Sequence, residues 1–214
     1  FENKSVASVF HLTEKEGQLY ICTNCGLFIF NPDNEPTVSR SVKGITSLIF
    51  SLAFDIDGSI WIGSRGLFKY KEGEELECID ELKECRCCSI DIGKDGEILV
   101  ATDGKGIWCL KNGKSKFINN DNTGIESDFT YLVKKQEDYV IAGSRHGVSI
   151  IDQSNGKCYN YKAANGLGLS STKDGSLITE QDGTIFICGT DGIVRLFEGK
   201  FKAPSRFPDF VFDN

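Results

Sequence analysis

A short sequence pattern repeats five times along the chain and constrains its fold more than any other feature. Each copy has a glycine, an apolar or aromatic run in near-alternation, a Ser or Thr, a short gap, and a second glycine with another apolar run. The clearest copy reads Gly58-Ser-Ile-Trp-Ile-Gly-Ser64 followed by Gly66-Leu-Phe-Lys-Tyr70. The Ser/Thr anchors lie at positions 23, 64, 102, 144 and 190, so successive copies are 41, 38, 42 and 46 residues apart. A period of about forty residues is that of a β-propeller blade.

Each copy predicts a strand, a tight turn and a second strand, because β-branched and aromatic residues suit a half-buried sheet and the glycines mark hairpins. A further apolar run precedes each copy, and a more polar segment follows it. The sequence therefore predicts an all-β fold, a β-propeller of four-stranded blades over residues 1–203. We expect residues 204–214 to form an exit strand or linker toward a following domain. The large aromatic residues at strand centres are expected to be buried between sheets: Trp61, Trp108 and Phe186.

Composition and charge exclude several classes of function. Hydrophobic residues make up 40% of the 214 residues and charged residues 26%, as in a globular domain. The formal net charge is −7 and there is no basic cluster, which argues against binding to nucleic acid or directly to a membrane surface. Methionine is absent even at position 1. We expect either that the chain is a segment of a longer protein or that modified methionines went unrecorded.

The repeat also indicates a particular type of blade. A Trp-Asp pair or a Gly-Gly doublet, which mark other propellers, does not occur. Residues 58–70 instead resemble the two-component-regulator propeller repeat, residues 17–30 and 96–110 fit it well, and residues 138–151 and 183–197 are degenerate copies. Such repeats form the extracytoplasmic sensor part of hybrid histidine kinases. Those propellers usually have seven blades, so the five repeats either close on themselves or form an arc of a larger propeller.

The resemblance implies a biological setting. It implies a non-enzymatic sensor ectodomain in the periplasmic or extracellular part of a membrane-anchored protein. It also implies a saccharide-like signal, contact with neighbouring domains of the same polypeptide, a kinase downstream, and dimerisation. The alternatives are a propeller lyase or hydrolase, and a scaffold for protein–protein interaction.

One face of the predicted disc is a candidate ligand-binding surface. In a four-stranded blade, the turn between the second and third strands lies on the same face as the link to the next blade. These turns and links carry arginines, lysines, acids and hydroxyls, which suit a polar small molecule or an oligosaccharide. The residues predicted to bind it are Arg65, Arg86, Lys105, Ser127, Asp128, Arg145 and His146.

Metal binding and catalysis are not predicted. Cys22 and Cys25 have the spacing of a zinc-ligand pair, as do Cys85 and Cys88, but the two pairs fall in different blades. Cysteines within strands are expected to act as small core residues, and any disulfide pairing among the nine stays open. The Asn- and Asp-rich run at residues 119–124 resembles a calcium loop but suits turn chemistry better. No Gly-x-Ser-x-Gly elbow occurs and only two histidines are present, so we predict no catalytic residue, metal or cofactor.

Overall fold

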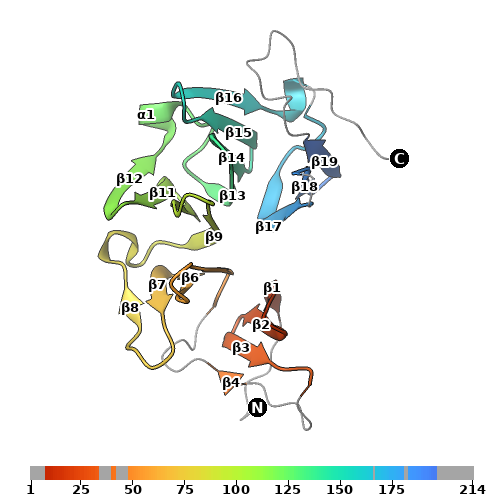
Figure 1. Ribbon diagram of the computed structural model, residues 1–214. Coiled ribbons are helices and arrows are strands. Elements are labelled where there is room, and N and C mark those ends of the chain that lie inside the picture. The colour runs from red at the N-terminus through yellow and green to blue at the C-terminus, as the bar shows by residue number, and fades with distance from the viewer. Residues whose placement is uncertain (1–7, 34–39, 42–47, 166, 181–182, 197–214) are drawn as a thin grey trace.

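Five antiparallel sheets follow one another in chain order around a common axis (Figure 1). This computed structural model describes residues 8–33, 40–41, 48–165, 167–180 and 183–196. The expected exit strand or linker at 204–214 lies outside the described residues. Since each sheet is made of strands consecutive in sequence, the predicted β-propeller fold is confirmed.

The first three blades each contain four strands, in order from the axis outward. Blade 1 has β1 (Val9–Lys15), β2 (Gln18–Thr23), β3 (Gly26–Phe30) and β4 (Arg40–Ser41). Blade 2 has β5 (Ser51–Phe54), β6 (Ile60–Ser64), β7 (Gly66–Tyr70) and β8 (Glu77–Cys78). The short 3-10 helix η1 (Asp80–Leu82) leads to blade 3, which has β9 (Cys87–Ile92), β10 (Ile98–Thr102), β11 (Gly106–Lys111) and β12 (Lys114–Ile118).

The last two blades continue the same order. The short helix α1 (Asn120–Thr123) precedes blade 4, which has β13 (Thr130–Gln136), β14 (Tyr139–Ser144), β15 (Gly147–Asp152) and β16 (Lys157–Tyr161). After the 3-10 helix η2 (Ala163–Asn165), blade 5 has β17 (Thr172–Thr179), β18 (Ile185–Gly189) and β19 (Ile193–Leu196). Four strands per blade are thus found in blades 1–4, and three in the described part of blade 5.

The repeated Ser/Thr anchor closes the turn between the second and third strands. Thr102 Oγ1 donates to the carbonyl of Gly106 at 2.6 Å and accepts the N–H of Lys105 at 3.2 Å. Thr23 and Ser144 make the corresponding pairs of hydrogen bonds in blades 1 and 4. A hydroxyl that bonds to nearby backbone stabilises a turn, which explains the Ser or Thr at this position in blades 1, 3 and 4. In blade 2, Ser64 Oγ instead donates to the carbonyl of Leu48.

The glycine after the anchor is required by close packing. Gly106 and Gly147 have φ values of +76° and +139°, which L side chains rarely adopt. A Cβ atom on Gly147 would lie 2.0 Å from the carbonyl oxygen of Tyr161, and one on Gly106 would lie 2.2 Å from that of Ile118. Only glycine therefore allows the outermost strand to end beside the turn.

Apolar side chains between neighbouring blades form the core. Four buried clusters join blade 1 to 2, 2 to 3, 3 to 4 and 4 to 5. Trp61 and Trp108, at 3% and 1% exposure, both lie in the cluster between blades 2 and 3, as predicted. Each indole N–H has an acceptor, Asp55 Oδ2 at 2.9 Å and Glu81 Oε2 at 3.2 Å, so burial leaves neither indole N–H unpaired.

The expectation for Phe186 is wrong. Its ring is only half-buried. Successive residues of a strand face opposite sides of the sheet, and the flanking Ile185 and Ile187 face blade 4. Phe186 therefore faces away from blade 4, on a side where the described residues place no further blade.

Replacement of Trp61 by alanine tests the packing between blades. The substitution removes a ring buried against blade 3, so we expect the free energy of unfolding to fall by about 3–5 kcal/mol. Ile56→Ala is the control, because Ile56 is 93% exposed and its loss should change stability by no more than about 0.5 kcal/mol. Denaturant unfolding of both variants measures the difference. An equal loss of unfolding free energy in the two variants would contradict the assignment of Trp61 to the core.

Candidate functional site

The turns between second and third strands meet the links between blades on one face of the propeller, which we call the turn face. Two backbone bridges show this, one between Arg65 and Arg86 and one between Asp103 and Phe129. The N–H groups of Gly104 and Gly106 also both donate to the carbonyl of Asp128, at 3.0 and 2.8 Å. The predicted juxtaposition is therefore confirmed for the turns of blades 2 and 3, which meet the links into blades 3 and 4.

Arg86 is held by its own neighbours on this face. Its guanidinium carbon lies 4.3 Å from the centroid of the Phe50 ring, and Nη1 lies 3.8 Å from Oδ2 of Asp103. The side chain is half-buried, whereas Arg65, paired with it through backbone, is exposed. Arg86 therefore stabilises the junction of blades 2 and 3 through a cation–π contact and an ion pair. A substitution there changes packing as well as any contact with a ligand.

The link into blade 4 is ordered by side-chain hydrogen bonds. Asp128 Oδ1 accepts the N–H of Asn120 at 2.7 Å, and Ser127 Oγ accepts the N–H of Phe129 at 3.1 Å. Asn119 caps helix α1 by accepting the N–H of Asn122, whose own side chain accepts the N–H of Asn119. The Asn-rich run thus satisfies local backbone, which supports the interpretation as turn chemistry over the calcium loop.

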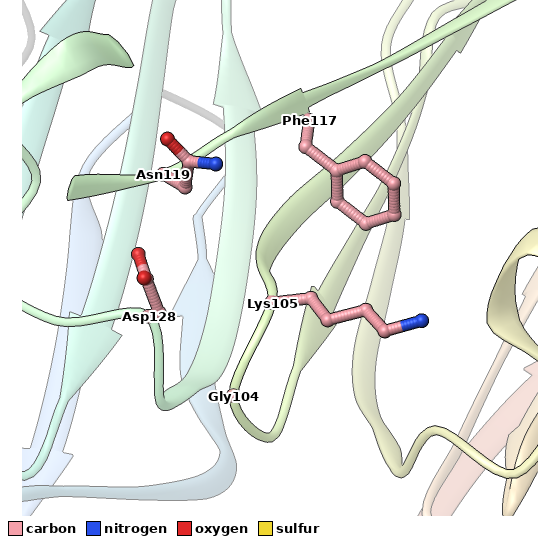
Figure 2. A pocket seen from close by; sticks show the side chains of 5 residues that line it. All are labelled: Gly104, Lys105, Phe117, Asn119 and Asp128. Carbon is pink, nitrogen blue, oxygen red and sulfur yellow. The ribbon is translucent and has the colours of Figure 1, made fainter. Parts of the chain in front are cut away.

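A pocket of about 280 Å³ opens where this link meets the turn of blade 3. Figure 2 shows Asn119 and Asp128 on one side and Phe117 with Lys105 on the other, while Gly104 lies in the turn. Lys105 Nζ lies 6.0 Å from the centroid of the Phe117 ring and donates to the carbonyl of Glu81 at 3.1 Å. The pocket therefore combines an aromatic face, a cation, a carboxylate and an amide on a backbone held by hydrogen bonds.

The seven predicted residues are distributed unevenly around this pocket. Lys105 and Asp128 line it, whereas the other five do not. Arg145 and His146 lie exposed in the corresponding turn of blade 4. Sequence reasoning missed three lining residues, Gly104, Phe117 and Asn119. The signal for Asn119 was present in the Asn-rich run, whereas Phe117 lies on an outer strand that the repeat pattern does not define.

A second cavity, of about 350 Å³, follows the axis between the innermost strands. Asp91 of blade 3 lines it and lies 2.8 Å from Lys134 Nζ of blade 4, and it also accepts the N–H of Lys135 at 2.7 Å. Burial raises the pKa of Asp91 and lowers that of His11, so the His11 imidazole is neutral at pH 7. The Asp91–Lys134 ion pair joins blade 3 to blade 4, so its role is structural.

The cysteines are free thiols in this structure. Burial raises the pKa of Cys22 and of Cys109 to about 12, as expected for thiols that act as core residues. Cys22 and Cys25 lie in blade 1, whereas Cys85 and Cys88 lie at the start of blade 3. In the described ranges, no group of three or more His, Cys, Asp or Glu side chains has the geometry to hold a metal ion.

Comparison with known proteins supports the fold. Neither a protein-family model nor a curated protein matches the sequence. Among solved structures, the chain is similar to two extracellular domains assigned to hybrid two-component systems of B. thetaiotaomicron. One is 19% identical with a TM-score of 0.75, over 87% of this chain and 27% of that one. The other is 16% identical with a TM-score of 0.70, over 90% and 26%.

The chain is also similar to a streptogramin B lyase, at 13% identity and a TM-score of 0.68, over 92% of this chain and 67% of the lyase. At these identities the likeness shows a shared β-propeller fold. The chain spans about a quarter of the length of each extracellular domain. The resemblance inferred from the repeat is therefore confirmed at the level of the fold. Among the described residues, no helix has the length and apolar character to cross a membrane.

Metal analysis tests the interpretation of the cysteines. If they are core residues, the purified chain should contain no stoichiometric zinc, and a chelator should leave its melting temperature unchanged because no metal contributes to folding. Elemental analysis and thermal unfolding with and without chelator are the measurements. About one zinc per chain, with a lower melting temperature after chelation, would show that the interpretation is wrong.

Proposed function

We propose that this chain is the propeller part of a two-component sensor ectodomain and that it binds a polar, polyhydroxylated ligand, such as an oligosaccharide, on the turn face. The observation that carries the proposal is the pocket formed by Lys105, Phe117, Asn119 and Asp128. The similarity to extracellular domains of two-component systems supports the sensor role by analogy between folds.

The chemistry of the pocket suits a sugar. A pyranose ring presents an apolar C–H face, which can lie against the Phe117 ring, and hydroxyl groups around its edge. Asp128 accepts hydrogen bonds, Lys105 donates them, and the Asn119 amide can do both. Bonds to charged groups are stronger than bonds between neutral groups, so Lys105 and Asp128 would contribute most to affinity.

The remaining predicted residues would extend this surface for a longer ligand. Arg65 and Arg86 lie on the blade 2 side, and Ser127 lies next to Asp128 in the link to blade 4. Arg145 and His146 lie on the next turn, in blade 4. An oligosaccharide that crosses several blades would contact them outside the pocket. The proposal further includes an extracytoplasmic location, neighbouring domains of the same polypeptide that receive the signal, and dimerisation.

Ligand binding by pocket variants tests the proposal. Isothermal titration of a panel of neutral and acidic oligosaccharides should identify a ligand, and Lys105→Ala and Asp128→Asn should each weaken its binding roughly tenfold to hundredfold. Phe117→Leu should also weaken it, because the ring face is lost. Lys116→Ala is the matched control for Lys105→Ala. Lys116 is an exposed lysine on β12, the strand that carries Phe117, and it does not line the pocket.

The same experiment distinguishes binding from catalysis. The ligand recovered after titration should be chemically unchanged. Cleavage or elimination of the ligand would favour the lyase alternative, which the likeness to streptogramin B lyase raises. Parent-like affinity in all three pocket variants would overturn the site assignment.

A further inference from the structure

One aromatic side chain of the turn face is largely exposed. Phe129 directly precedes β13, the innermost strand of blade 4, and is 54% exposed. A Cβ atom added to Gly104 would lie 3.6 Å from Cε1 of the Phe129 ring, so the ring lies beside the turn of blade 3. Gly104 lines the pocket, and so does Asp128, the residue before Phe129 (Figure 2). The Phe129 ring therefore adjoins the pocket without lining it.

Comparison of the blades explains this exposure. The residue that directly precedes the innermost strand is Phe50 in blade 2 and Arg86 in blade 3. The guanidinium carbon of Arg86 lies 4.3 Å from the centroid of the Phe50 ring and covers it, and Phe50 is only 6% exposed. In blade 5, which follows the blade of Phe129, the residue at this position is Ser171. Its hydroxyl donates to the carbonyl of Thr172 at 3.2 Å, and its short side chain cannot extend over a neighbouring ring.

Charged groups border the exposed ring. Asp103 pairs with Phe129 through backbone, and its Oδ2 atom lies 3.8 Å from Nη1 of Arg86. The Asp103 and Arg86 side chains are 32% and 35% exposed, so both reach solvent. A paired carboxylate and guanidinium offer hydrogen-bond acceptors and donors without a net charge. This edge of the turn face thus has an apolar ring next to paired polar groups, the same combination that the pocket has.

We propose that Phe129, Asp103 and Arg86 form a second sugar subsite, and that the ligand is a linear oligosaccharide of at least two units. The inference rests on the proposed function, because it takes the pocket as the first subsite. The first unit lies in the pocket, and the second places its C–H face on the Phe129 ring and its hydroxyl groups toward the ion pair. The oligosaccharide therefore runs from the pocket toward the propeller axis, because Phe129 leads into an innermost strand.

Continuity with the pocket distinguishes this ring from an ordinary exposed residue. Single exposed apolar side chains are common on protein surfaces and by themselves indicate no ligand. Phe129 instead follows Asp128 directly and its ring lies beside Gly104, and both of those residues line the pocket. Phe117 comes from β12, the outermost strand of blade 3, whereas Phe129 comes from the link into blade 4. The two rings thus lie on the outer and the inner side of the same turn, as two successive sugar units require.

Sugars of increasing length test the second subsite. The probes are glucose, maltose and maltotriose, and the acidic series galacturonate, digalacturonate and trigalacturonate. Each probe is titrated calorimetrically against the 214-residue chain. In at least one series the disaccharide should bind at least about tenfold more tightly than the monosaccharide, because the Phe129 ring contacts only the second unit.

Two variants remove the second subsite in different ways. Phe129→Leu removes the ring, and Ser171→Arg introduces a guanidinium that can cover the ring as Arg86 covers Phe50. In each variant the roughly tenfold advantage of the disaccharide over the monosaccharide should fall to about onefold. Ser171→Ala is the matched control, because it removes the hydroxyl but leaves the ring exposed, and it should bind both sugars like the parent chain. Phe117→Leu, in the pocket, should weaken the binding of both sugars.

The outcomes separate this inference from the proposed function. A disaccharide that binds no more tightly than the monosaccharide, or whose advantage survives in both Phe129→Leu and Ser171→Arg, overturns the second subsite and leaves the pocket in place. Loss of the advantage in Ser171→Ala also overturns it, because the hydroxyl and not the ring would then be responsible. Parent-like binding of both sugars by Phe117→Leu, or no binding of any probe, overturns the pocket and the second subsite together.

Discussion

Packing between neighbouring blades is the interaction on which the rest of this structure depends. A single antiparallel sheet in water cannot bury both of its faces, and every blade of this chain is apolar on both. Strict alternation along the strands sends one set of residues to the preceding blade and the other to the following blade. Trp61 and Leu67 reach forward to Val100 and Trp108, and the same geometry recurs at each junction. The ring arrangement is the consequence of that two-sided burial.

The turn face owes its rigidity to the same repeat. In blades 1, 3 and 4 the Ser/Thr anchor bonds to the glycine that begins the third strand. In blades 2 and 3 backbone hydrogen bonds join the turn to the next link. Lys105 and Asp128 are thereby placed beside one pocket although they are far apart in the chain. Arg86 lies on the same face but contacts Phe50 and Asp103 and does not line the pocket. Residues of similar type on one face thus differ in whether the fold places them beside the pocket.

Much of the fold could be predicted because a repeat supplies the same information several times. A degenerate copy in blade 4 could be aligned through the clear copy in blade 2, and so the turns and links were assigned to one face. The site was predicted less well. Phe117 and Asn119 enter the pocket from an outer strand and a helix cap, which follow no periodic pattern. Phe186 was expected to be buried because it is a large aromatic residue at the centre of a strand, and this inference failed since burial also needs a neighbouring blade.

The sequence by itself determined the local structure: the strands, the hairpin turns, which residues of a strand share one face of its sheet, and the number of repeats in the chain. These features depend on interactions between residues close in sequence, such as Thr102 with Gly106, and on the period of two along a strand. Only the tertiary structure decided which faces are covered, which charges are engaged, and which side chains share a pocket. Those properties depend on what lies across from a residue in space. Leu12 and Leu52 have equivalent positions and the same side chain, yet one is exposed and the other buried, because only Leu52 has a blade packed against it.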